Sequence, residues 1–91
     1  MTYTQLNPKP VAEKKTLATS VAIASGATSS AYSIPTKTGY SIGGVTPYVY
    51  GSGWGNIQAT VNMDTTSVYF RNVSGTAWTV NLALMVLYLP V

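Results

Sequence analysis

The side chains of this sequence that could perform acid–base or metal chemistry are few. Across 91 residues there is no histidine and no cysteine, and the carboxylate side chains are Glu13 and Asp64. General acid–base catalysis needs His, Asp, Glu, Lys, Tyr or Cys at a tuned pKa, and zinc needs Cys, His or carboxylate ligands. Serine and threonine are abundant, but they have no base beside them. The sequence therefore predicts that the protein is not an enzyme and holds no metal or cofactor.

Three aromatic side chains could instead bind a ligand without reacting with it. Tyr48, Tyr50 and Trp54 lie in the stretch GGVTPYVYGSGWGN. Two residues that are two positions apart share one face of a strand, so a tryptophan on the following glycine loop could fold over both tyrosines. Sugars stack on such aromatic platforms, and Asn56 or Gln58 would supply hydrogen bonds. Aromatic residues also pack small β cores, and turn geometry explains the glycines, so a structural role stays open.

The charge distribution argues against a nucleic-acid partner. The net charge is +3, but four of the seven charged side chains lie in the first fifteen residues. A nucleic-acid binder usually carries a basic stripe interleaved with aromatic residues, whereas the remainder of this chain has only Lys37 and Arg71 as cations. The most apolar stretch, residues 82–91, is about half of the roughly twenty residues that a membrane-spanning helix needs. No membrane partner is predicted either.

Hydrophobic alternation predicts an all-β fold. The segments expected as strands are 16–23, 29–34, 40–50, 57–63, 68–72 and 77–89. Turn signals separate them every eight to twelve residues, and no segment has helical periodicity with caps. The paired glycines Gly43 and Gly44 indicate a bulge within their strand. We expect a single antiparallel β-sandwich or jelly-roll-like domain of about six short strands over residues 16–91.

The first fifteen residues are expected to form an extended N-terminal arm. The stretch MTYTQLNPKPVAEKK has two prolines within three residues, and each removes a backbone donor and disfavours helix at the residue before it. One interpretation is a free chain end. The other is a tether that becomes ordered on a neighbouring subunit, with Tyr3, Leu6 and Val11 as its apolar anchors.

The last expected strand is apolar on both faces over its second half. Its even positions are Trp78, Val80, Leu82, Leu84, Val86 and Tyr88, which form a continuous inward face. Its odd positions start polar and continue as Ala83, Met85, Leu87 and Leu89. In an antiparallel sheet one face normally meets water, so these four residues predict an interface with other copies of the chain, as a homotrimer around a central axis. The alternative is that the N-terminal arm folds back over them.

The order of turns and strand edges resembles that of small all-β structural modules of tailed bacteriophages. Such modules occur in tail-fibre and baseplate head domains and in accessory virion proteins. The resemblance covers about residues 25–89. The residues that carry it are Ser25, Gly26, Gly39, Tyr40, Gly43, Gly44, Val45, Val68, Tyr69, Arg71, Asn72, Ser74, Val86, Leu87 and Tyr88.

The resemblance implies a virion component that is often trimeric and works by binding. A short arm in place of a long fibre shaft favours an accessory protein, such as a capsid decoration or head-fibre subunit. The arm would engage other virion proteins, such as capsid or tail subunits. The alternative is a carbohydrate-binding receptor-recognition module of a phage tail or bacterial adhesin, with a host surface glycan as its partner.

Overall fold

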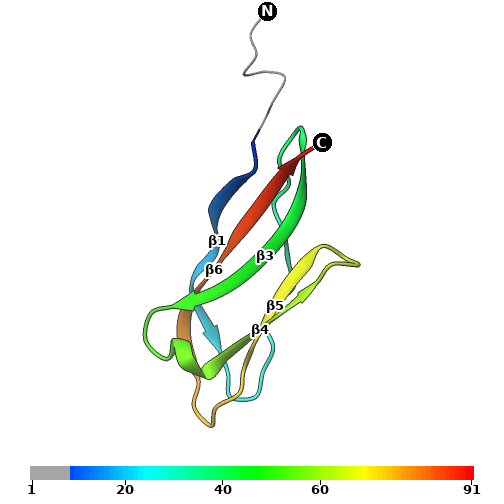
Figure 1. Ribbon diagram of the computed structural model, residues 1–91. Helices are drawn as coiled ribbons and strands as arrows, with labels where there is room; N and C mark the ends of the chain where they lie inside the picture. The colour runs from blue at the N-terminus through cyan, green and yellow to red at the C-terminus, as the bar shows by residue number, and fades with distance from the viewer. Residues whose placement is uncertain (1–8) are drawn as a thin grey trace, which may run out of the picture.

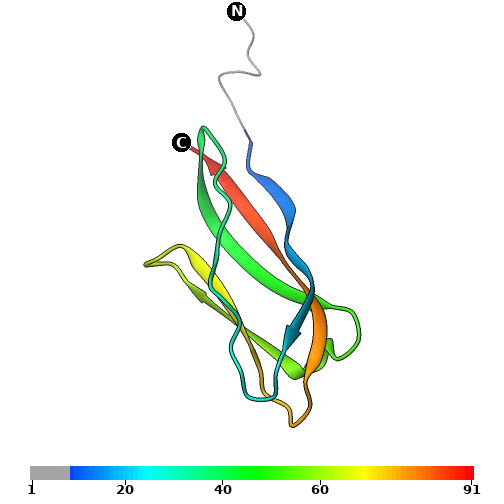
Figure 2. The same ribbon diagram turned by 180° about the vertical axis from the view of Figure 1, so that it is seen from behind.

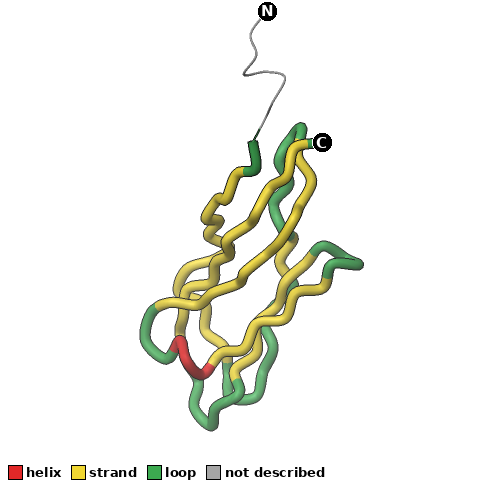
Figure 3. Tube along the Cα trace, viewed as in Figure 1, coloured by secondary structure: helices red, strands yellow, loops and turns green. Residues whose placement is uncertain are grey.

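Alternating β-branched, aromatic and small polar residues give the chain six strands and one short 3-10 helix over the part that the structure describes. This computed structural model describes residues 9–91. The elements are β1 (Val11–Ile23), β2 (Tyr32–Ser33), β3 (Tyr40–Tyr50), the 3-10 helix η2 (Trp54–Asn56), β4 (Ile57–Asn62), β5 (Ser67–Asn72) and β6 (Trp78–Pro90) (Figures 1 and 3).

Two three-stranded antiparallel sheets pack against each other. One has the strand order β1-β6-β3 and the other the order β2-β5-β4 (Figures 1 and 2). The first and last strands are therefore neighbours, and β6 lies at the centre of its sheet with a partner on each side. This arrangement confirms the all-β sandwich that the alternation predicts.

The core lies between the two sheets and comes mainly from the even positions of β6. Its fully or almost fully buried apolar side chains are Ile23, Ile34, Val68, Phe70, Val80, Leu82, Leu84, Val86 and Tyr88. Burial of one such large side chain stabilises the fold by roughly 1.5–3 kcal/mol. The hydroxyl group of the buried Tyr88 has a hydrogen-bond partner, because it donates to the carbonyl oxygen of Pro35 at 2.7 Å.

The expected bulge in β3 is present. The pairing of β3 with β6 shifts register between Ile42 and Gly44. A Cβ atom at Gly43 would collide with the side chain of Leu89 on β6. Glycine at position 43 thus lets the Leu89 side chain lie directly against the backbone, and a larger residue there would force that side chain to move.

The expected boundary between arm and domain is wrong by five residues. β1 begins at Val11, and Val11, Glu13 and Lys15 pair with β6 opposite core residues. Residues 11–15 thus belong to the sheet and not to the arm. The strand is hard to recognise in the sequence because Glu13 and Lys15 occupy inner-face positions, where alternation predicts apolar side chains. Of the three expected arm anchors, Val11 lies in β1, whereas Tyr3 and Leu6 lie outside the described residues.

Two other strands are shorter than predicted. β2 has two residues, and one isolated bridge joins Thr28 to Arg71 upstream of it. β4 ends at Asn62, so Met63 lies in the hairpin turn with 51% of its surface exposed. The second sheet is consequently smaller than the first and leaves one end of the β1-β6-β3 sheet to be covered by the 34–39 segment.

Candidate interaction surfaces

The outer face of the β1-β6-β3 sheet is the face that points away from the second sheet. Antiparallel pairing places directly opposite residues on the same face, so its members follow from the register. They are Ala12, Lys14 and Thr16 on β1; Asn81, Ala83, Met85, Leu87 and Leu89 on β6; and Ser41, Gly44, Thr46, Tyr48 and Tyr50 on β3. The structure thus brings the expected interface residues and two of the three expected aromatic residues onto one surface.

This outer face is largely apolar and open to solvent. The exposed fractions are 39% for Leu87, 37% for Leu89, 36% for Tyr48 and 42% for Tyr50, and Met85 is half-buried. The outer face of the other sheet differs, since its β4 and β5 positions are Gln58, Thr60, Asn62, Ser67, Tyr69 and Arg71. One sheet has an ordinary solvated face and the other does not.

The structure removes Ala83 from the set of residues expected at the interface. It is fully buried in the single chain, although it lies on the outer face. Its methyl group lies between Thr16 and Tyr48, the residues directly opposite it on the flanking strands. Ala83 therefore has no surface left for a partner, and the exposed apolar contacts come from Met85, Leu87 and Leu89 together with the tyrosines.

Lys14 is the one charged side chain among the outer-face residues. It is exposed and pairs with Met85 across the β1–β6 ladder. Because β1 is an edge strand, a lysine there can bury its aliphatic stem and keep its ammonium group in water. The face can therefore be covered without burying a charge.

Both edges of the β1-β6-β3 sheet are interrupted. β1 has register shifts between Thr16 and Ala18 and between Ala18 and Val21, and Ser20 has a positive φ of 51°. β3 contains Pro47, which has no N–H to donate to an added strand. Bulges and prolines on edge strands oppose the addition of another strand. Association through this sheet is thus favoured at its face and not at its edges.

Trp54 does not complete an aromatic platform with the two tyrosines. Tyr48 and Tyr50 pair with each other, with ring centroids 6.1 Å apart and an interplanar angle of 33°. Trp54 lies on η2 beyond the end of β3, is 65% exposed, and has no aromatic partner among residues 9–91. Asn56 ends the same 3-10 helix. The four residues expected to bind a saccharide therefore lie on two separate surfaces.

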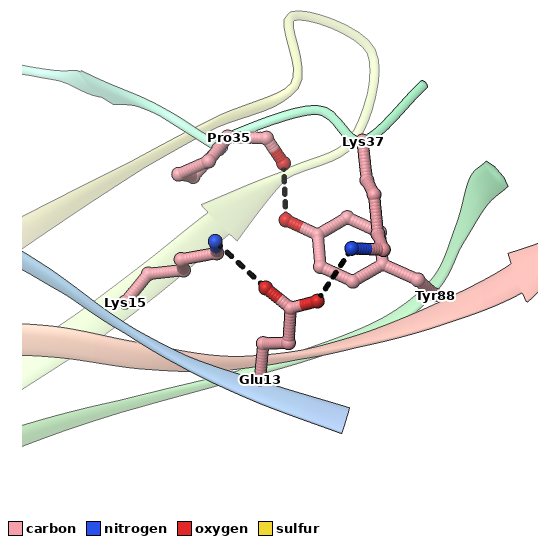
Figure 4. A network of polar contacts seen from close by, with 5 residues as sticks. All are labelled: Glu13, Lys15, Pro35, Lys37 and Tyr88. Carbon is pink, nitrogen blue, oxygen red and sulfur yellow. Dashed lines mark hydrogen bonds and ion pairs between the residues drawn. The ribbon is translucent and has the colours of Figure 1, made fainter. Parts of the chain in front are cut away.

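A small ion cluster closes the end of the sandwich where β1 begins, and no motif in the sequence indicated it. The two Glu13 carboxylate oxygens lie 2.8 Å from Lys15 Nζ and 2.9 Å from Lys37 Nζ (Figure 4). Lys37 also lies 5.5 Å from the ring centroid of Tyr40. The cluster holds the 34–39 segment, whose Pro35 carbonyl accepts the Tyr88 hydroxyl, against β1. These ion pairs give Glu13 and Lys15, the two charged side chains at inner-face positions, partners of opposite charge.

The ion cluster shifts two pKa values. Hydrogen bonds from Lys15 and then Lys37 lower the pKa of Glu13 below its ordinary value of 4.5. The hydrogen bond to Glu13 raises the pKa of Lys15 above 10.5. Glu13 and Lys15 therefore stay charged at neutral pH, as the partners of a structural ion pair do.

Neither a metal site nor a membrane-spanning helix is found in the part of the chain that the structure covers. Within residues 9–91, no three side chains of the His, Cys, Asp or Glu type come together as ligands. The same residues form no helix of the length and apolarity needed to cross a bilayer. Comparisons with protein-family models, with curated proteins and with solved structures found no significant match.

Proposed function

We propose that this protein is a non-enzymatic structural subunit of a bacteriophage particle that assembles as a homotrimer through the outer face of its β1-β6-β3 sheet. The observation that carries the proposal is that face, where Leu87, Leu89, Tyr48 and Tyr50 are between 36% and 42% exposed beside the half-buried Met85. A contiguous apolar surface of this kind marks an interaction site in a soluble protein. The phage context comes from the resemblance of the turn and strand pattern.

The size of the outer face indicates that a stable assembly needs contacts beyond this face. Three strands at about 4.8 Å spacing and about ten residues at 3.3 Å each give a flat area on the order of 470 Å². A stable interface buries about 800 Å² per partner. The face alone is thus marginal for a pair of copies. Additional contacts from the N-terminal arm, with Tyr3 and Leu6 as anchors, would supply the remainder on a neighbouring copy or on another virion protein.

The position of the chain ends is suited to docking by the arm. β1 begins and β6 ends at the same end of the sandwich, where Val11 pairs with Tyr88 (Figures 1 and 2). An arm that leads into β1 therefore holds this end closest to the particle. The loops at the other end of the sandwich point away from it.

The native mass of the purified full chain tests self-association. We expect a trimer by light scattering and native mass spectrometry at micromolar concentration, with a dissociated fraction that grows on dilution because the face is small. Removal of residues 1–9 leaves β1 complete and should preserve the fold while it abolishes co-sedimentation with particles assembled without this subunit. A monomer at all concentrations would contradict self-assembly, and full particle occupancy of the truncated chain would contradict docking by the arm.

A further inference from the structure

The end of the sandwich opposite the start of β1 and the end of β6 carries an exposed tryptophan. β3 ends, β6 begins and β1 ends there, as the pairings Tyr50–Asn81 and Ile23–Trp78 show (Figures 1 and 2). The 3-10 helix η2 projects from this end, red in Figure 3, beside the turn that precedes β6. We call the loops 51–56 and 73–77 the distal tip.

The loop that carries Trp54 is anchored to its surroundings. Gly53 has a φ of 79°, and a Cβ atom there would overlap the Trp78 ring, so this ring packs flat against the loop backbone. Trp78 Nε1 donates to Ser74 Oγ at 3.1 Å. The Val73 amide donates to the Asn56 carbonyl oxygen at 3.0 Å. The two loops of the distal tip are thereby joined to each other.

The buried side chain of Asn72 holds the second loop of the distal tip, residues 73–77, in place. Asn72 is fully buried, and its Nδ2 donates to the carbonyl oxygens of Ile23 at 2.9 Å and Thr76 at 2.8 Å. Its Oδ1 accepts from the Ser74 amide at 2.9 Å and from the Ser74 hydroxyl at 2.7 Å. All hydrogen-bonding positions of the amide are used. The distal tip is therefore a preorganised platform, which lowers the entropic cost of binding there.

The chemistry of the distal tip selects the ligand class. None of the residues in its two loops carries a charge. With 65% of its surface exposed, Trp54 offers on the order of 160 Å². That area is far below the roughly 800 Å² that each partner contributes to a protein interface, and it is close to the area of one sugar ring. An uncharged aromatic surface on the same short 3-10 helix as Asn56 fits a neutral sugar better than an acidic one or a protein.

We infer that the distal tip is a binding site for a neutral saccharide, which stacks on the outward face of the Trp54 indole and hydrogen-bonds to Asn56. This site goes beyond the proposed assembly role and depends on it only for the outward direction of the tip. Tyr48 and Tyr50 are not part of the site, because they lie on the outer face of the β1-β6-β3 sheet. Assembly and sugar binding thus use separate surfaces of one small domain.

Titration of the ¹⁵N-labelled full chain with maltohexaose, chitotetraose and, as the charged comparison, sialyllactose tests the inference. The two indole N–H signals are separate reporters, since that of Trp78 is hydrogen-bonded to Ser74 and serves as an internal reference. We expect at least one neutral oligosaccharide to shift the Trp54 signal with a Kd on the order of 1 mM, as a single stacked ring provides. Trp54→Ala should weaken binding at least tenfold, and Trp54→Phe should restore part of it.

Tyr69→Ser is the matched control, because it removes an aromatic ring from the outer face of the other sheet, outside both the distal tip and the proposed assembly face, and should leave the affinity unchanged. The inference is overturned if none of the neutral sugars shifts the Trp54 signal, if Trp54→Ala binds as well as the wild type, or if binding is lost in Tyr69→Ser. It is also overturned if sialyllactose binds best, or if Trp54→Ala loses attachment to a particle protein. The native mass of Trp54→Ala should equal that of the wild type, so failure here is distinguishable from failure of assembly.

Discussion

A single lysine on the outer face should separate the copies of the proposed homotrimer without unfolding them. Leu87 is 39% exposed in the isolated chain, and full burial of a leucine is worth about 1.5–3 kcal/mol, so Leu87→Lys forfeits about 1 kcal/mol of contact per copy. The new ammonium group has no acidic partner on this face, where the existing charge is Lys14. Its desolvation adds about 2 kcal/mol or more. A total of about 3 kcal/mol per copy weakens association more than 100-fold.

Sedimentation velocity across a concentration series measures this change, and a thermal melt followed by circular dichroism reports the fold. Thr60→Lys is the matched control, because it makes the same charge change at an exposed position on the outer face of the other sheet. Leu87→Lys should sediment as a monomer with a nearly unchanged melting temperature, and Thr60→Lys as the wild type does. The reasoning is refuted if both variants dissociate alike, or if Leu87→Lys retains the wild-type mass.

Two further predictions concern stability. Asn72→Ala removes four hydrogen bonds made by a fully buried side chain, which should cost about 2–4 kcal/mol and lower the melting temperature by roughly 10 °C or more; a shift of only a few degrees would contradict the role given to Asn72. The lowered pKa of Glu13 means that its stabilising contribution is present above about pH 4.5 and is lost as the pH falls through the lowered value. The urea midpoint of Glu13→Gln should therefore lie below that of the wild type at pH 7 and meet it in strong acid. A gap that persists at pH 2 would exclude the ion cluster as its cause.

The fold was predictable where local pattern and tertiary environment agree. In β6, alternation assigned the buried face correctly, because Leu82, Leu84, Val86 and Tyr88 are all fully buried. The paired glycines likewise indicated a bulge in β3. Both features depend on residues that are close in the sequence.

What could not be predicted depends on contacts between residues far apart in the chain. Glu13 and Lys15 hide the start of β1, and only the distant Lys37 explains why charged side chains are tolerated there. The apolar outer face was foreseen from β6 alone. That Tyr48 also belongs to it follows from the β3–β6 register, which the sequence does not reveal.

The central position of β6 makes its sheet depend on the strand that follows both of its partners in the sequence. β1 and β3 do not pair with each other, so both must wait for β6 before either has a sheet partner. Such pairing between distant segments makes folding slow, and during synthesis it starts only after β6 has left the ribosome. A chain interrupted before Trp78 lacks most of the core and the β6 part of the outer face. Such a shortened chain therefore cannot form the β1-β6-β3 sheet, because neither β1 nor β3 has its pairing partner.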